Sequence, residues 1–162
     1  MWHLIGGSVL SGVATSLIDN FLLDKVDPEP GCVVYCDLAL GYAEHSGIYV
    51  GNGEIVHLNG EGEIERLGAQ EFLARLDGFN PAVSIYVSCD ENAAPQGGRR
   101  IAQRALAQVG RWRDYNVIMD NCHQFSSGCV TGDFENSDNV LRLLKHRCHK
   151  HRDACQWRVW DR

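Results

Sequence analysis

The stretch EHSGIYVGNGEIVHL, residues 44–58, carries two histidines on a segment with the alternation of a β-hairpin. Apolar residues recur with a period near two on both sides of Asn52-Gly53, a dipeptide that is typical of a tight turn between strands. His45 lies in the first expected strand and His57 in the second. The chemistry available to this hairpin depends on whether the two imidazoles share one face of the sheet.

The register of the hairpin decides that question. A two-residue loop of Asn52 and Gly53 with regular pairing on either side would put the histidines on opposite faces, since side chains alternate along a strand. A three-residue loop that adds Gly51 pairs Gly47 with His57 instead. This is the arrangement of a type I turn followed by a bulge, and Gly53 supplies its left-handed residue.

The three-residue loop also separates the apolar side chains from the others. One face of the hairpin then consists of Ile48, Val50, Val56 and Leu58. The other face contains Gly47, Tyr49 and Ile55 together with both histidines, whose backbones would be diagonal neighbours about 6–8 Å apart. We therefore predict that His45 and His57 converge, with room beside the glycine, against the alternative that each is an ordinary half-buried strand residue.

A cysteine 65 residues after His57 would complete a nucleophilic site. Cys122 follows Asp120 and Asn121, two good N-caps, and opens an expected helix that ends near Gly132. A thiol in a first helical turn lies at the positive end of the helix dipole beside unpaired backbone N–H groups, and both favour a thiolate. The same amides could stabilise an oxyanion. The alternative is a buried core thiol without chemistry.

The rest of the chain predicts an α+β fold. Strands are expected over 32–36, 46–51, 54–59 and 83–89, and helices over 69–76, 97–110, 120–132 and 138–150, the last capped by Ser137. Because strands come first and helices follow, we predict an antiparallel sheet packed against helices rather than an alternating α/β fold. A chain of 162 residues is long enough for one sizeable core.

Charge is distributed unevenly along the sequence. Residues 142–162 hold seven Lys or Arg against two Asp, while the whole chain has a net charge of −6. An acidic body is a poor non-specific binder of nucleic acid, so no nucleic-acid partner is expected. The apolar segment before residue 26 or the basic C-terminus could contact an anionic membrane peripherally; alternatively, the basic end docks on its own acidic domain.

The cysteines predict a reduced environment. Their number, seven, is odd, and the N-terminus lacks the basic region and cleavage site of a secretory signal. We therefore predict a cytoplasmic location, which is compatible with association with a membrane. Histidines and cysteines over 146–155 match no standard ligand spacing, and no pair of C-x2-C motifs is present, so no metal site is expected.

Taken together, these motifs resemble a known family. EHSGIYVGNGEIVHL, followed by NCHQF and CVTG, is similar to the lecithin:retinol acyltransferase (LRAT)-like branch of the NlpC/papain-like superfamily, over about residues 30–140. The resemblance implies a permuted papain-like fold, in which the histidine strands precede the cysteine helix. It further implies that Cys122 is the nucleophile, His45 the general base and His57 the polar residue that orients His45. No metal or organic cofactor takes part in such a site.

The activity implied by this resemblance is that of a thiol-dependent acyltransferase or acyl hydrolase. In the family, the cysteine takes an acyl group from a phospholipid or related ester as a thioester, and water, an amine or an alcohol then accepts it. Two alternatives stay open: an NlpC-type cysteine peptidase or amidase that acts on an amide substrate, and a non-catalytic module that docks on a membrane or protein. The chain would divide into an apolar helical segment (1–26), a catalytic domain (27–141) and a basic helical extension (142–162).

Overall fold

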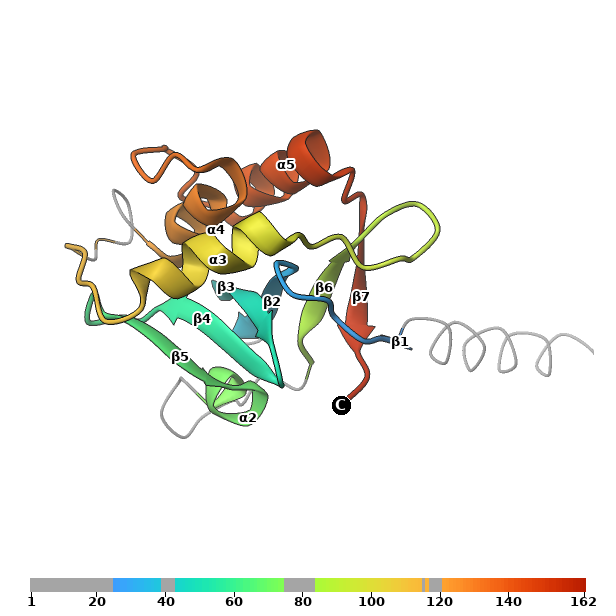
Figure 1. Cartoon of the computed structure of the whole chain (residues 1–162), viewed down its shortest axis with the longest axis horizontal. Coiled ribbons are helices and arrows are strands. Elements are labelled where there is room, and N and C mark those ends of the chain that lie inside the picture. The colour runs from blue at the N-terminus through green and yellow to red at the C-terminus, as the bar shows by residue number, and fades with distance from the viewer. Residues whose placement is uncertain (1–24, 39–42, 75–83, 115, 117–120) are drawn as a thin grey trace, which may run out of the picture.

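A seven-stranded β-sheet forms the centre of the part of the chain that the structure describes, namely residues 25–38, 43–74, 84–114, 116 and 121–162. In this computed structural model the strands are β1 (Lys25–Val26), β2 (Val33–Leu38), β3 (Ala43–Gly51), β4 (Glu54–Leu58), β5 (Ile64–Gly68), β6 (Tyr86–Cys89) and β7 (Gln156–Trp160). The helices are α2 (Ala69–Leu73), α3 (Arg99–Gln108), α4 (Cys122–Thr131) and α5 (Leu141–Arg152). The strand order is β1-β7-β6-β2-β3-β4-β5 (Figure 1).

The α+β class with an antiparallel sheet is confirmed. Among the described strands, only the edge pair β1 and β7 is parallel, and the other neighbours are antiparallel. The expected strands correspond to β2, β3, β4 and β6, and the expected helices to α2, α3, α4 and α5. Strands β1, β5 and β7 were not predicted. Of the apolar helical segment predicted over 1–26, residues 1–24 are outside the described residues, and Lys25–Val26 form β1 instead of helix.

The C-terminal segment differs from the helical extension predicted over 142–162. Helix α5 has Val140 rather than Ser137 as its N-cap, and it ends at Arg152. Asp153 follows with a left-handed φ of 55°, a conformation that terminates helices. The chain then returns as β7, between β1 and β6, so this segment is part of the central sheet. The domain boundaries at 26 and 141 stay a prediction.

Two clusters of buried apolar side chains, one on each face of the sheet, hold these layers together. On one face, Ile48, Val56 and Leu58 pack with the inward faces of α3, α4 and α5, including Phe125. On the other face, Ile55 packs with Phe72 of α2 and with residues from β2 and β6. The predicted division of the hairpin into two faces is therefore confirmed. Burying each such side chain contributes about 1.5–3 kcal/mol, so both faces fix the register of β3 and β4.

The hairpin turn reaches the predicted facing by another route. Asn52 and Gly53 have φ values of 54° and 76°, as in a two-residue type I′ loop, and Gly51 pairs with Glu54. Between Tyr49 and Gly51 the register shifts by a bulge, after which Ile48 pairs with Val56 and Tyr49 with Ile55. Thus the loop is shorter than predicted, and the extra residue is absorbed in β3. The shorter loop and the bulge have opposite effects on the register, so the histidines still share a face.

Gly47 lies in a fully packed position. A Cβ atom there would lie 2.7 Å from Ile55 Cγ2 and 2.8 Å from the Val56 carbonyl oxygen, so the predicted room beside this glycine is already filled. We expect Gly47→Ala to lower the free energy of unfolding by about 1–3 kcal/mol through overpacking, as measured by urea denaturation. Gly60→Ala is the matched control, because a Cβ at Gly60 meets nothing within 4 Å. Equal effects of the two substitutions would contradict this packing argument.

Candidate active site

Two buried histidines contact each other between β3 and β4. His45 is 9% and His57 0% exposed, and His45 Nε2 lies 2.8 Å from His57 Nδ1, a hydrogen-bonding distance. The ring centroids are 4.9 Å apart, with planes at 84°. The prediction that the two imidazoles share a face and converge is confirmed.

Phe72 of α2 forms an apolar wall beside this pair. Its ring centroid lies 5.0 Å from that of His45 and 5.8 Å from that of His57, and the side chain is fully buried. Electrostatic interactions and hydrogen bonds are stronger where water is excluded. The phenyl ring therefore strengthens the contact between the imidazoles.

Glu65 extends the histidine pair towards solvent. It is directly opposite His57 in the β4–β5 ladder, and its Oε1 lies 3.3 Å from His57 Nε2. Asn59 Nδ2 donates a hydrogen bond to the same oxygen over 3.2 Å. A carboxylate beside Nε2 favours the proton on that nitrogen, so that His57 Nδ1 accepts from His45 Nε2. In this tautomer the lone pair of His45 is on Nδ1.

Sequence reasoning missed Glu65 because it did not predict β5. The signal was present: residues 59–62, NGEG, are typical of a turn, and the segment 64–68 that follows forms a hairpin with β4. With that register, Glu65 would have been placed opposite His57.

Cys122 is the first residue of α4, as predicted. The side-chain oxygen of Asn121, the N-cap, accepts hydrogen bonds from the backbone N–H groups of His123 and Gln124 over 2.9 and 3.2 Å. At the other end, Gly132 is the left-handed C-cap with a φ of 88°. The buried face of the helix anchors it on the sheet, so the start of α4 is fixed by caps and by packing.

The environment of Cys122 overturns the prediction of a favoured thiolate. The residue is only 4% exposed, and burial raises its pKa above the ordinary value of a thiol. Hydrogen bonding with the backbone and side chain of Ser46, and with backbone groups of His123, lowers the pKa but does not offset the burial. The helix-dipole argument is local, whereas desolvation depends on the whole fold. The resting group is therefore a thiol.

A buried polar network connects Cys122 with β3. Ser46 Oγ lies 2.9 Å from His123 Nδ1 and 3.0 Å from Ser126 Oγ. Burial lowers the pKa of His123 to about 4, so this imidazole is neutral at pH 7. Sequence reasoning did not identify Ser46, although it follows His45 directly. Two adjacent residues of β3 thus contact the two parts of the site: His45 contacts His57, and Ser46 contacts the start of α4.

Cys36 gives a second indication of where Cys122 lies. It pairs with His45 across β2 and β3, and its pKa is raised to about 12, first by burial and then by the nearby Cys122 sulfur. The structure therefore brings the two histidines together and places Cys122 against the same part of β3. The approach of the sulfur to an imidazole, and the catalytic roles of the three residues, stay a prediction.

Comparison with models of protein families gives a match over most of the chain. A family model described as lecithin retinol acyltransferase matches residues 27–135, a range that includes Cys122 and both histidines. The chain belongs to the lecithin retinol acyltransferase family. The resemblance seen in the sequence is thereby confirmed.

Two relatives share part of their length with this member of the family. The chain is 32% identical to phospholipase A and acyltransferase 2 of Homo sapiens over 100 residues, which are 52% of this chain and 60% of that protein. It is 26% identical to the genome polyprotein of avian encephalomyelitis virus (strain L2Z) over 117 residues, which are 72% of this chain and 5% of the polyprotein. The matched regions thus span less than two thirds of either relative.

Two further findings concern metal ions and membranes. Within the described ranges, no group of three or more His, Cys, Asp and Glu side chains is placed to hold a metal ion. None of the helices in the described part combines the length and apolarity needed to cross a bilayer.

Proposed function

We propose that this chain is a thiol-dependent acyltransferase or acyl hydrolase that forms an acyl-thioester on Cys122. Membership of the lecithin retinol acyltransferase family supports this proposal, as does the similarity to phospholipase A and acyltransferase 2. The observation that carries it is the 2.8 Å contact between His45 of β3 and His57 of β4. Ser46, the residue after His45, is hydrogen-bonded with Cys122. The proposed acyl donor is a phospholipid or a related ester.

In the first half-reaction, Cys122 Sγ attacks the carbonyl carbon of the ester while His45 Nδ1 takes the thiol proton. General-base assistance is needed because burial keeps the resting cysteine protonated. The oxyanion of the tetrahedral intermediate requires a donor at the helix start. Since Asn121 engages the N–H groups of His123 and Gln124, we assign this role to the Cys122 N–H.

The intermediate then collapses by cleavage of the ester C–O bond. His45 returns the proton to the leaving alkoxide, so that an alcohol, such as a lysophospholipid, departs and the thioester remains. In the second half-reaction the same imidazole deprotonates water, an amine or an alcohol, which attacks the thioester and restores the thiol. His57 orients His45 throughout, with Glu65 next to His57 Nε2.

Mass spectrometry of the intact chain incubated with phosphatidylcholine tests this proposal. We expect a mass increase equal to one fatty acyl group, located on the peptide that contains Cys122 and removed by hydroxylamine. Cleavage of a peptide panel without such an adduct would instead support the amidase alternative. With neither adduct nor cleavage, the non-catalytic docking module would be the better interpretation.

Glu65 should have a smaller, positioning effect. Its side chain is 31% exposed, so we expect Glu65→Gln to lower kcat by about fivefold, the equivalent of a partly exposed ion pair. Without the negative charge a protonated histidine pair is less stable, and the acid limb of the pH–rate profile should move to lower pH. Glu61→Gln, an exposed neighbour in the preceding turn, is the matched control. An unmoved acid limb would contradict the role of Glu65.

A further inference from the structure

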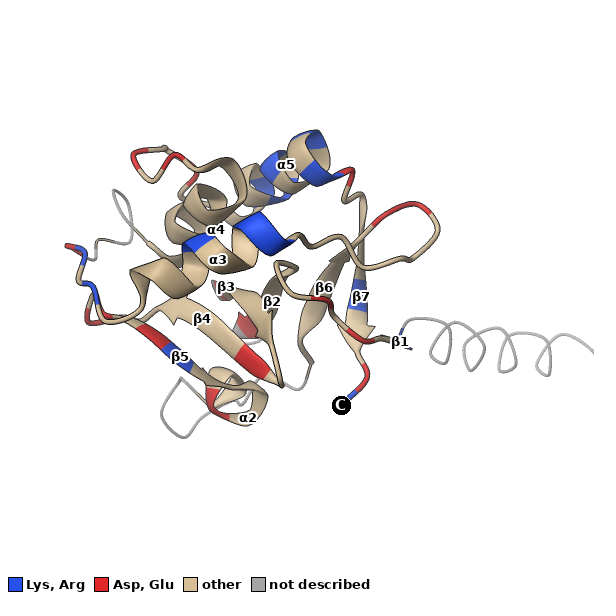
Figure 2. Cartoon of the chain, viewed as in Figure 1, with Lys and Arg blue, Asp and Glu red and all other residues tan. Residues whose placement is uncertain are grey.

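Helix α5 has a charge opposite to that of the rest of the protein. Its twelve residues, LRLLKHRCHKHR, include five Lys or Arg, three His and no acid. Since the full chain has 15 Lys or Arg and 21 Asp or Glu, the other 150 residues are strongly acidic. Figure 2 shows this concentration as blue turns along α5.

The helix presents part of this charge to solvent as a continuous ridge. Leu141, Leu144 and Cys148 are buried against the domain. Exposed side chains at i, i+4 and i+8 form the ridge, which we call the basic face: Arg142, His146 and Lys150. Its length is about 12 Å at 1.5 Å per residue.

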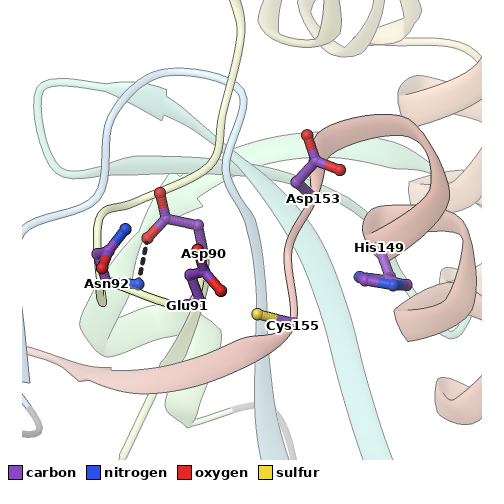
Figure 3. Close-up of a pocket in the computed structure, with 6 residues that line it drawn as sticks. All are labelled: Asp90, Glu91, Asn92, His149, Asp153 and Cys155. Carbon is purple, nitrogen blue, oxygen red and sulfur yellow. Dashed lines mark hydrogen bonds between the residues drawn. The ribbon is translucent and has the colours of Figure 1, made fainter.

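Within the described residues, no ion pair neutralises the basic face. Among the described residues, the ion pair formed from α5 is that of Arg147 with Asp138, at 2.8 Å, and neither residue belongs to the basic face. A cavity of about 370 Å³ with acidic walls adjoins the C-terminal end of the helix, and His149 and Asp153 line it (Figure 3). The alternative that the basic segment docks on its own domain therefore applies to the inner side of α5 and not to the basic face.

The start of α5 lies beside the candidate active site. Asn121, the N-cap that precedes Cys122, donates a hydrogen bond from Nδ2 to the Asn139 carbonyl oxygen over 2.7 Å, two residues before the helix. One turn into α5, Lys145 Nζ donates to the Tyr35 hydroxyl over 3.0 Å and lies 4.3 Å from the centroid of that ring. Tyr35 is next to Cys36 on β2, and Cys36 pairs with His45.

We propose that the basic face docks on the anionic headgroups of a phospholipid membrane and holds the start of α4 next to the lipid surface. The choice of a membrane as the partner rests on the proposed lipid substrate; the docking itself rests on the charge and exposure of the helix. A cationic residue close to an anionic bilayer gains electrostatic attraction that acts over about one Debye length. Docking of α5 would thereby bring Cys122, at the start of α4, close to its proposed lipid substrate.

Vesicle co-sedimentation of the 162-residue chain tests this proposal. The Cys122→Ser background prevents turnover, and the probe is phosphatidylcholine with about one third phosphatidylserine, in about 0.1 M salt. We expect Arg142→Gln/Lys150→Gln to weaken binding about 30-fold, equivalent to about 1 kcal/mol for each removed charge. The matched control is Arg66→Gln/Arg111→Gln, which removes two exposed cations outside α5 and should leave binding within about twofold.

Several results would overturn the membrane interface. The first is an equal loss of vesicle binding in the two double variants. The second is equal binding of the chain without either double substitution to vesicles of pure phosphatidylcholine and to the anionic vesicles. The third is tighter binding to an RNA oligonucleotide than to the anionic vesicles. The test is separate from that of the enzyme. Charge-dependent vesicle binding without an acyl adduct would support the docking surface and contradict the proposed activity. An acyl adduct without charge-dependent binding would support the activity and contradict the docking surface.

Discussion

Replacing Cys122 by serine should abolish the acyl adduct and lower kcat on the order of 10⁴-fold or more, as for other covalent nucleophiles. A hydroxyl has a far higher pKa than a thiol, and the burial that already raises the pKa of Cys122 acts on an alkoxide in the same direction. The base would therefore have to remove a much less acidic proton. Turnover of a short-chain ester and the mass of the intact protein are the measurements.

Serine is a conservative replacement at this position, so loss of folding should not obscure the result. The neighbouring hydroxyls of Ser46 and Ser126 already form a buried polar network with His123, and one more hydroxyl can join it. Cys155→Ser is the matched control, since Cys155 is the exposed cysteine among those described. If Cys122→Ser kept most of the activity, or Cys155→Ser lost it, the assignment of the nucleophile would be wrong.

The facing of the histidines could be predicted from sequence because burial fixes it. With Ile48 and Val56 on one side of the hairpin and Ile55 on the other, a slip of one residue would move each apolar set to the opposite face and break its packing. The turn itself was not predictable in detail. A two-residue loop with a bulge and a three-residue loop present the same faces, and the pattern of apolar residues does not distinguish them.

Features that depend on distant segments were missed. Strand β7 has the aromatic and β-branched alternation of a strand, but its partners β1 and β6 lie about 130 and 70 residues earlier, and a basic context favoured helix. The prediction of a favoured thiolate at Cys122 failed for the same reason. The dipole and caps of α4 are local and were predicted, whereas the burial that outweighs them comes from packing against β3.

The proposed mechanism therefore works by proton transfer at the moment of attack rather than by a stored thiolate. A buried thiol at the start of α4 is unreactive until a base is aligned with it, which agrees with the proposal that the substrate arrives from a lipid surface. In the proposed mechanism His45 is that base, and its hydrogen-bonding contact with His57 fixes the tautomer. The identity of the base can be tested directly, because three imidazoles lie near the site and only one is assigned to the proton.

We expect His45→Gln to lower kcat by about 10²–10⁴-fold, the range for loss of a general base, and to slow alkylation of Cys122 by iodoacetamide. The glutamine amide can still donate to His57 Nδ1, so the substitution removes the titratable group while keeping the contact seen at 2.8 Å.

His123→Gln is the discriminating comparison. His123 is adjacent to Cys122, but it is held by Ser46, and its pKa of about 4 makes it a weak base, so its replacement should cost far less than that of His45. His151→Gln, at an exposed position at the end of α5, controls for the loss of any histidine. Unfolding midpoints should be measured alongside, to separate catalysis from stability. Should His123→Gln prove as damaging as His45→Gln at equal stability, the proton would have to be assigned to the imidazole on α4 rather than to the one on β3.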